Sequence, residues 1–385
     1  GGALTLGGSG TASGGFAVGT SQDPDAITDA VQIFNSSLNT ANGALTIKGR
    51  APDSGAAGAG VHIFGLTTLN SGTGNISVDG RVTSAATAGN KDGVVIGEGS
   101  SSKVTLTASG SGGISLYGDA SSIGNVLSGA RYDGVFISQG ALIQTAAGDI
   151  QIIGKGGGGN LYVSDQNHGV RLESLNTSIL SSSGNILLGG VAGGKDGSFG
   201  LYSGGSQMYL GRTDAGSASG NIDFVADSMF FTNSSSIRLQ AGTSGELRLR
   251  TWNTGRDISL GTTETALTAT ALGLSSTWFA GSNAVFRPGF SHVTVGGAGV
   301  SPVAGTGTLT VTSATTVRDN LNLRMEGTGG KLALTNALTV QGASSAARTL
   351  SLSAQAGASG AGLITADQLQ LVGSGDFSLT GNNLV

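Results

Sequence analysis

The spacing of four isoleucines constrains the fold of this 385-residue chain more than any other feature of its sequence. Each stands in a short segment that reads Gly-x-apolar-x-apolar, and successive copies are 36 residues apart. These residues are Ile114, Ile150, Ile186 and Ile222. A fixed period of about 20 to 50 residues indicates stacked repeats, and the alternation inside each segment predicts short β-strands. Ile258, in RDISLG, extends the count once more, although the strand-like segment ELRLR (246–250) intervenes.

Two further motifs keep step with this one, so the repeating unit holds three short strands. A Gly-Val-x-apolar motif recurs at GVHI (60–63), GVVI (93–96), GVFI (134–137) and GVRL (169–172). A third strand-like segment lies between the two motifs, as in KVTLT (103–107) and ALIQT (141–145). Gly, Ser and Asn stand at the corners, and a loop of variable length closes each unit.

A three-stranded unit of this size cannot bury its own apolar face, but a stack of such units can. Each strand would pair in parallel with its equivalent one coil away, at a spacing of ~4.8 Å. The isoleucines would then form one inward column, while Ser115 and Gln151 face outward. A second inward column would run beside it, formed by Leu116, Ile152, Leu188 and Phe224. Because parallel crossovers are right-handed, the sequence predicts an all-β protein that folds as a right-handed parallel β-helix (β-solenoid) with three short strands per coil.

The glycine content supports ordered corners. The chain contains 70 glycines and only 4 prolines, a composition that a flexible linker could also have. The glycines are phased with the apolar pairs, however, and we expect many of them to adopt positive φ in tight turns. Asn75, Asn185 and Asn221 precede strands at one such corner, and Asn also tolerates the left-handed region.

The repeat pattern divides the chain into three consecutive parts. Residues 1–28 are expected to form an initial coil or turn region, and residues 29–243 the regular solenoid coils, built from modules of about 36 residues. From residue 244 the spacing loosens, and residues 244–385 are predicted to continue the same solenoid irregularly. Residues 265–290 form the least strand-like stretch, which we expect to be a lateral excursion or a short non-strand element.

Charge and composition exclude several classes of partner. The net charge is −4 and no basic field covers the chain, so nucleic acid is not an expected partner. No apolar run approaches the ~18 residues of a membrane span, and no signal peptide opens the sequence, so we do not expect the chain to span a membrane. Cysteine is absent, which fits a chain exported unfolded through an outer-membrane pore and equally fits many cytosolic proteins.

The repeated GVxI and GNIxLxG coils resemble the internal repeat region of filamentous haemagglutinin-like large exoproteins, adhesins of bacterial two-partner secretion. RDISLG, LTVTSATTV (309–317) and the segment GLITADQLQLVGSGDFSLTGNNLV (362–385) resemble the same family. The likeness covers most of the chain, but nothing in it resembles the family's amino-terminal secretion-recognition domain. The resemblance implies an extracellular or cell-surface location, export through an outer-membrane transporter, and a role in adhesion, aggregation or biofilm matrix.

Two motifs with reactive side chains have simpler explanations than a site. GGKDG (193–197) is close to a phosphate-binding loop, yet Asp196 stands where that motif needs Ser or Thr, and strand-like sequence follows. A surface loop explains it. The histidines, His62, His168 and His292, lie far apart in the sequence. Because His62 lies between two inward residues of GVHI, it should face outward and be solvated rather than bind a metal.

Asp92, Asp133 and Asp196 each precede a glycine near the start of a strand. Stacking would bring Asp92 and Asp133 close together, and two carboxylates at that range need a cation or solvent to screen them. Calcium is one candidate, but an Asp-Gly turn requires no metal, and the repeat lacks the nonapeptide of calcium-binding solenoids. We therefore expect no metal and no cofactor.

The arginines gather once, around a tryptophan. An exposed Trp252 between guanidinium groups could hold an acidic glycan, although outward strand faces also carry such residues without function. The candidate glycan-binding residues are Arg238, Arg248, Arg250, Trp252 and Arg256. A second aromatic group could stack on sugars, but a small core within the excursion explains it more simply. This second aromatic group consists of Trp278, Phe279, Phe286 and Phe290.

These features predict a mechanical role, as a structural segment of a secreted or cell-surface bacterial fibre. Polysaccharide-active enzymes also use β-helices, but they need converging carboxylates, and the 23 acidic residues here are spread along the chain. We expect no enzymatic activity; the alternatives are a carbohydrate-binding adhesin module or, more remotely, such an enzyme. The segments GGALTLGG (1–8) and FSLTGNNLV (377–385) are strand-like, so the expected partners are further coils or copies of the fibre, end to end. Cell-surface or matrix polysaccharide would be the partner of the adhesin alternative.

Overall fold

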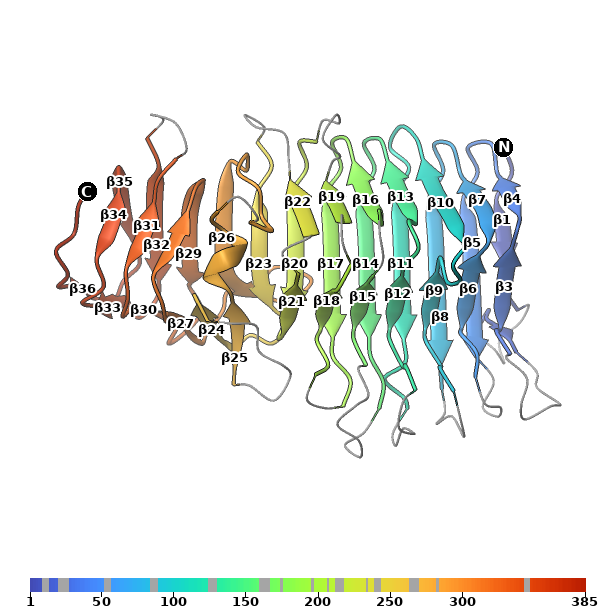
Figure 1. Ribbon diagram of the computed structural model, residues 1–385, viewed down its shortest axis with the longest axis horizontal. Coiled ribbons are helices and arrows are strands. Elements are labelled where there is room, and N and C mark those ends of the chain that lie inside the picture. The colour runs from blue at the N-terminus through green and yellow to red at the C-terminus, as the bar shows by residue number, and fades with distance from the viewer. Residues whose placement is uncertain are drawn as a thin grey trace.

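The structure is a computed structural model that describes residues 1–8, 14–19, 28–51, 57–83, 89–123, 130–158, 167–173, 176–194, 197–205, 208–211, 218–232, 235–238, 244–262, 270–281, 284–342 and 347–385. In these segments the chain winds in successive coils along one axis, so the two termini lie at opposite ends of an elongated molecule (Figure 1). Strands of successive coils pair in parallel with their equivalents. The predicted all-β parallel β-helix is confirmed.

Among the described residues, one sheet of 13 strands runs from one end of the molecule to the other. It contains the strand of each coil that begins with the isoleucine motif or its equivalent. Its members are β1 (Leu4–Leu6), β2 (Ala17–Val18), β5 (Leu45–Ala51), β8 (Ile76–Val82), β11 (Ile114–Asp119), β14 (Ile150–Lys155), β17 (Ile186–Val191), β20 (Ile222–Ala226), β23 (Leu247–Thr251), β26 (His292–Ala298), β29 (Asn320–Met325), β32 (Thr349–Ala354) and β35 (Gln368–Val372).

Two sheets of seven strands complete the coils of the first part. The Gly-Val motif gives β3 (Val31–Phe34), β6 (Val61–Phe64), β9 (Val94–Ile96), β12 (Val135–Ile137), β15 (Val170–Leu172), β18 (Leu201–Ser203) and β21 (Met229–Phe231). The segments between the motifs give β4 (Ser37–Asn39), β7 (Leu66–Asn70), β10 (Lys103–Ala108), β13 (Leu142–Thr145), β16 (Ser178–Ser181), β19 (Met208–Gly211) and β22 (Ser235–Arg238). A coil such as β9, β10 and β11 therefore has the three predicted strands.

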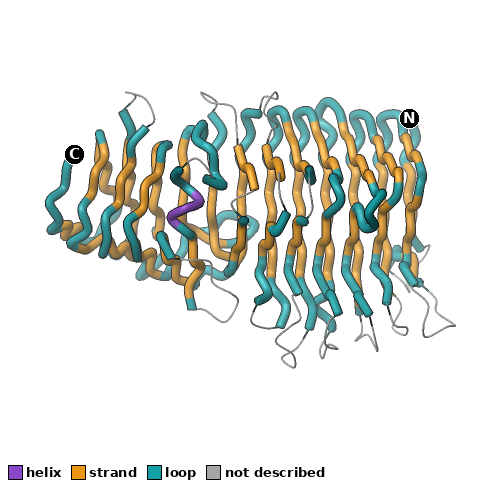
Figure 2. The backbone as a smooth tube through the Cα atoms, in the orientation of Figure 1, coloured by secondary structure: helices purple, strands orange, loops and turns teal. Residues whose placement is uncertain are grey.

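From β24 onward, two other sheets replace the two seven-stranded sheets. One contains β24 (Asp257–Leu260), β25 (Ala271–Leu274), β27 (Thr308–Val311), β30 (Lys331–Leu334), β33 (Ala358–Gly360) and β36 (Phe377–Leu379). The other contains β28 (Thr315–Val317), β31 (Leu338–Val340) and β34 (Ile364–Ala366). The tube in Figure 2 shows one helical turn among the strands, the 3₁₀ helix η1 (Ser276–Trp278). The boundaries at residues 28/29 and 243/244 stay a prediction.

The isoleucine column is in register. Ile114 lies opposite Ile150, Ile150 opposite Ile186, and Ile186 opposite Ile222, and each is at most 2% exposed. Gln151, one residue further along β14, is exposed, as predicted. Leu116, Ile152, Leu188 and Phe224 form the second predicted column.

The prediction that Ile258 continues the isoleucine column is wrong. Leu247 of β23 lies opposite Ile222, whereas Ile258 belongs to β24 in another sheet. The strand-like segment between them, ELRLR, supplies the next turn of the long sheet after 25 residues instead of 36. A fixed residue spacing therefore predicts the members of the column only where successive coils have the same length.

The glycines before these strands are required for close approach between coils. A Cβ added to Gly148 would lie 1.9 Å from the carbonyl oxygen of Gly112, and one added to Gly184 would lie 2.0 Å from that of Gly148. None of the three has positive φ, so the expected left-handed turn is wrong for this column. Other corners do contain a glycine with positive φ, such as Gly110, where φ is 55°.

The aromatic residues near the middle belong to the main core. Trp278, Phe279, Phe286 and Phe290 are at most 3% exposed. The Trp278 ring meets Phe231 of β21 edge to face at 5.0 Å, and Phe286 lies 6.2 Å from Phe224 of β20. The expectation of a small separate core is therefore wrong, because these rings pack against strands of the preceding coil. Such buried rings offer no surface for stacking sugars.

Candidate functional site

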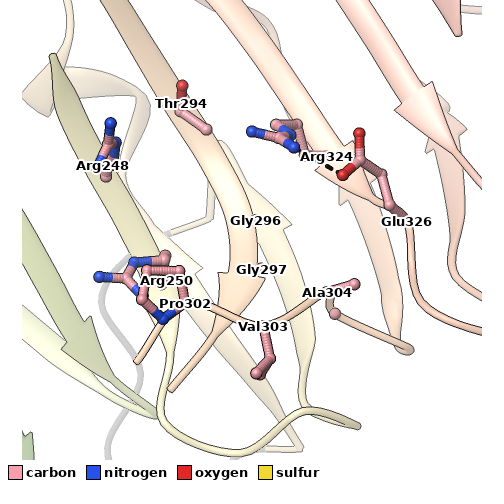
Figure 3. Close-up of a pocket in the computed structure, with 11 residues that line it drawn as sticks. Arg248, Arg250, Thr294, Gly296, Gly297, Pro302, Val303, Ala304, Arg324 and Glu326 are labelled. Carbon is pink, nitrogen blue, oxygen red and sulfur yellow. Dashed lines mark hydrogen bonds and ion pairs between the residues drawn. The ribbon is translucent and has the colours of Figure 1, made fainter. Parts of the chain in front are cut away.

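A cavity of about 340 Å³ opens beside β26, between β23 and β29 (Figure 3). Arg248 and Arg250 of β23 stand on one side of it. Arg324 of β29 and the following Glu326 stand on the other. The strand between them contributes mostly backbone, and this arrangement leaves room between the two charged sides.

A β-bulge in β26 forms the floor. The pairing register between β23 and β26 shifts after Leu249, so Arg250 faces two residues, Gly296 and Gly297. Both glycines have positive φ, 117° and 78°, and a Cβ on Gly296 would lie 1.9 Å from the carbonyl oxygen of Arg324. Bulges re-aim side chains and are common next to functional sites. Here the bulge places two glycines, which have no side chains, between Arg250 and Arg324 on the outer face of the sheet. A gap therefore lies between the two arginines.

The chain that follows β26 forms an apolar wall. Ala298 and Val303 exchange two backbone hydrogen bonds, of 2.9 and 3.0 Å, which close a tight antiparallel turn. Pro302 and Val303 line the cavity from this turn, and Val303 is 49% exposed. The cavity therefore has charged residues on two sides and an apolar stretch of chain along the turn that follows β26.

Arg250 holds this turn against the sheet. Its side chain is only 5% exposed, and Nη1 donates to the carbonyl oxygen of Gly299 at 2.5 Å. Nη2 lies 3.1 Å from Oδ1 of Asp223, on β20. The Nε atom is buried and has no hydrogen-bond partner among the residues that the structure describes. The Arg250 guanidinium is thus held beside the cavity by Asp223 and by the carbonyl oxygen of Gly299.

The other two arginines are more exposed. The Arg248 side chain is 33% exposed and its Nε donates to Glu246 at 2.7 Å; the Arg324 side chain is 51% exposed and its Nη2 lies 2.7 Å from Glu326. The hydrogen bond from Arg324 is the main reason why the pKa of Glu326 lies below its ordinary value. Among the described residues that line the cavity, three guanidinium groups face one carboxylate.

The structure brings together two of the five predicted glycan-binding residues, Arg248 and Arg250. Trp252 is half-buried, and its ring lies near Gly189. Arg256 donates to the carbonyl oxygen of Asp227 at 3.2 Å, and Arg238 ends β22, in a different sheet. The five-residue site stays a prediction. Sequence reasoning missed Arg324 and Glu326, although the Gly-Gly pair inside the strand pattern VTVGGAG (293–299) signals a bulge.

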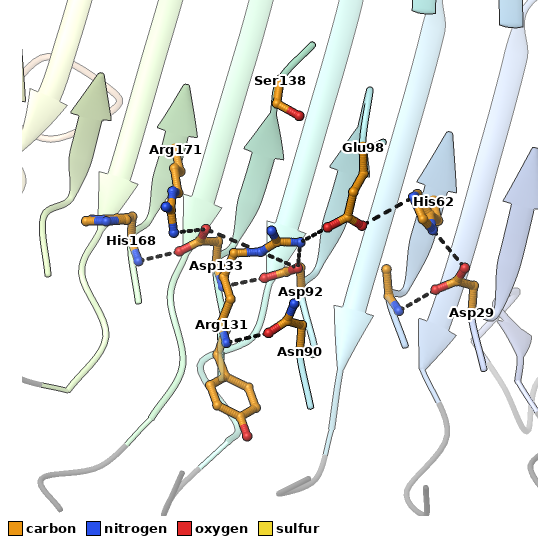
Figure 4. A network of polar contacts seen from close by, with 12 residues as sticks. Asp29, His62, Asn90, Asp92, Glu98, Arg131, Asp133, Ser138, His168 and Arg171 are labelled. Atoms are coloured by element: carbon orange, nitrogen blue, oxygen red, sulfur yellow. Dashed lines mark hydrogen bonds and ion pairs between the residues drawn. The ribbon is translucent and has the colours of Figure 1, made fainter. Parts of the chain in front are cut away.

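A second polar cluster lies where the chain enters the Gly-Val strands (Figure 4). Asp29, Asp92 and Asp133 each accept a backbone N–H from the next coil. The donors are Ala59 at 2.7 Å, Asp133 at 2.8 Å and His168 at 2.6 Å. The aspartates thus act as links between coils.

Arginine supplies the positive charge between the stacked aspartates. Nη2 of Arg131 lies 2.7 Å from Asp92, its Nε lies 3.8 Å from Asp133, and Nη1 of Arg171 lies 3.7 Å from Asp133. Burial raises the pKa of both carboxyls, most for Asp133, where repulsion from Asp92 adds to it. The predicted proximity of the two aspartates is confirmed. Asp196 lies outside the described residues, and within those residues no group of three or more His, Cys, Asp and Glu side chains could hold a metal ion.

The two histidines of this cluster differ in environment. His62 faces outward as predicted, but the expectation that it is solvated is wrong. Its side chain is only 13% exposed, with Nδ1 at 2.9 Å from Asp29 and Nε2 at 3.6 Å from Glu98. His168 is fully buried; its Nδ1 accepts the N–H of Phe199 at 3.0 Å, and its ring stacks on Tyr202 at 4.3 Å. Burial lowers the pKa of His168 to about 3.

No described helix is long and apolar enough to cross a membrane. No protein-family model matches the chain, and it has no match among curated proteins or solved structures.

Proposed function

We propose that this chain is a structural segment of a secreted or cell-surface bacterial fibre that supports adhesion, aggregation or a biofilm matrix. The observation that carries the proposal is the long sheet, which continues from β1 to β35 over a single apolar interior. Parallel coils of this kind extend by adding copies of the same pairing, so the architecture suits a load-bearing rod.

Export through an outer-membrane transporter of the two-partner type is part of the same proposal. The repeat style, which resembles large exoproteins exported in this way, supports it. The absence of cysteine is compatible with it, because no disulfide can form before translocation.

Within the described residues β35 pairs with β32 alone, and we propose that rods join through this strand. Leu369 and Leu371 of β35 continue the inward column of Leu350 and Leu352. Leu352 is fully buried, whereas Leu371 is 45% exposed. A further coil, from the same polypeptide or a second copy, would cover Leu371 and pair with the free edge of β35.

Association of the purified 385-residue chain tests the fibre proposal. Analytical ultracentrifugation and negative-stain electron microscopy should show rods that lengthen with concentration. Leu371→Lys should suppress this association, because the added charge would lie between two coils. Gln370→Lys adds the same charge on the outward face and should have little effect. A chain that stays monomeric at high concentration, or equal behaviour of the two variants, would contradict the proposal.

A carbohydrate-binding adhesin module is the second candidate function, and the cationic cavity at β26 favours it. A polysaccharide-active enzyme has less support, since Glu326 is the one carboxylate among the described lining residues and glycoside hydrolysis employs two. We therefore propose binding without catalysis at this cavity.

A further inference from the structure

We propose that the cavity between β23 and β29 binds the carboxylate of an acidic sugar, a uronic-acid residue within a polysaccharide. This inference rests on the binding-module candidate and gives its ligand class. It does not depend on whether the chain assembles into fibres.

The cationic side of the cavity suits a carboxylate. Arg250 on β23 and Arg324 on β29 flank the two-glycine floor of β26, so their backbones are two strand spacings, about 10 Å, apart. A carboxylate that enters between them meets guanidinium donors from both directions. Planar guanidinium groups bind carboxylates through paired hydrogen bonds.

The acidic residues that pair with Arg248 and Arg250 do not occupy the side of β23 that faces β26. Asp223 reaches Arg248 and Arg250 from β20, on the opposite side of β23 from the cavity. Glu246 approaches Arg248 along β23 itself, from just before the strand. Each guanidinium has five N–H donors, so these contacts do not exhaust either arginine.

The apolar side selects a ring over a simple anion. Pro302 and Val303 line the cavity from the turn after β26, and the glycine floor allows a flat ligand to lie against the backbone. Sulfate or phosphate would leave this wall unused, whereas the C–H face of a sugar ring would cover it. The volume of about 340 Å³ is at the small end of ligand cavities, which are roughly 300–1,000 Å³.

Glu326 acts as a competing carboxylate. It holds Arg324 at 2.7 Å, and a bound sugar carboxylate would have to displace it. Removal of the Glu326 charge should therefore strengthen binding, whereas removal of the Arg324 charge should weaken it. A purely structural role for this pair predicts no gain in affinity from either change.

Isothermal titration calorimetry with a galacturonic-acid trimer provides the test, with a neutral galactose trimer as the ligand control. Arg324→Gln should raise the dissociation constant about tenfold, the value of one hydrogen bond to a charged group. Glu326→Gln should lower it several-fold. Arg81→Gln is the matched control, because Arg81 lies in the same sheet, is 45% exposed and pairs with Asp79 at 3.0 Å. It should leave affinity unchanged.

Several results would overturn the proposal. They are absence of saturable binding by the unmodified chain, equal affinity for the neutral trimer, and equal weakening by Arg81→Gln. Displacement of the trimer by sulfate at the same concentration would reveal a site for simple anions and would also refute it. The association assay with Leu371→Lys is read independently, so failure here leaves the fibre proposal standing.

Discussion

Mild acid should destabilise the fold through His168. The ring is fully buried, its Nδ1 already accepts the N–H of Phe199, and its Nε2 is buried with no hydrogen-bond partner in the described part of the chain. Burial, with a smaller contribution from nearby Arg171, lowers the pKa of His168 from 6.5 to about 3. The unfolded chain binds this proton near pH 6.5 and the folded chain does not. Stability that is present above pH 6.5 is therefore lost as the pH falls.

The expected loss is large for one residue. Each pH unit below 6.5 costs about 1.4 kcal/mol until the folded-state pKa is reached. The loss at pH 4.5 is then about 3 kcal/mol, on the way to about 5 kcal/mol near pH 3. Asp92 and Asp133 act in the opposite direction, because their raised pKa values favour the folded state as the pH falls. A variant that changes only His168 separates the two effects.

His168→Phe keeps a ring against Tyr202 but cannot be protonated. The lost acceptor for Phe199 costs about 1–3 kcal/mol at every pH. Urea unfolding followed by far-UV circular dichroism should show that the unmodified chain loses about 3 kcal/mol more than the variant between pH 7 and pH 4.5. In NMR spectra the imidazole carbon of His168 should remain in its neutral position to pH 4.5. Titration near pH 6.5, or equal losses by the two chains, would refute the burial argument.

Three further outcomes follow from the packing. Ile150→Asp should cost several kcal/mol in thermal unfolding because it buries an unpaired charge, and Gln151→Asp should be nearly silent; equal shifts would contradict the inward column. Gly148→Ala should destabilise by about 3 kcal/mol or more because adjacent coils must separate, whereas Gly255→Ala, with its nearest atom at 3.8 Å, should stay within about 0.5 kcal/mol. Arg131→Met should cost about 3 kcal/mol because two buried carboxylates lose a partner, while a calcium chelator should leave the melting curve unchanged. A drop of more than about 5 °C with chelator would point to a bound metal instead.

The fold could be predicted because every coil repeats the same environment. Ile114, Ile150 and Ile186 recur at a constant interval, and the alternation around them fixes which side chains face inward. The prediction fails at Ile258, where the chain completes its turn sooner. Pairing there depends on which segment, ELRLR or RDISLG, has its apolar face opposite Ile222, and a residue count carries no such information.

The cavity was only partly predictable. Arg248 and Arg250 alternate on one strand, which the sequence shows directly, but Arg324 shares a cavity with them only because two glycines stand between on β26. Simple alternation would add Trp252 to the same outward row. However, β23 ends at Thr251, and Asp227 accepts the N–H of Trp252 at 2.9 Å, so the tryptophan leaves the row. Such departures depend on contacts between coils that local pattern does not encode.

The register of the isoleucine column has an evolutionary consequence. Ile114, Ile150 and Ile186 occupy equivalent positions, so loss or duplication of the 36 residues between two of them leaves every remaining strand opposite an equivalent neighbour. Unequal recombination within such a gene would lengthen or shorten its product by whole coils, and no new interior would have to arise. The reach of the molecule thereby becomes a trait that copy number sets, while each outer face remains free to diverge.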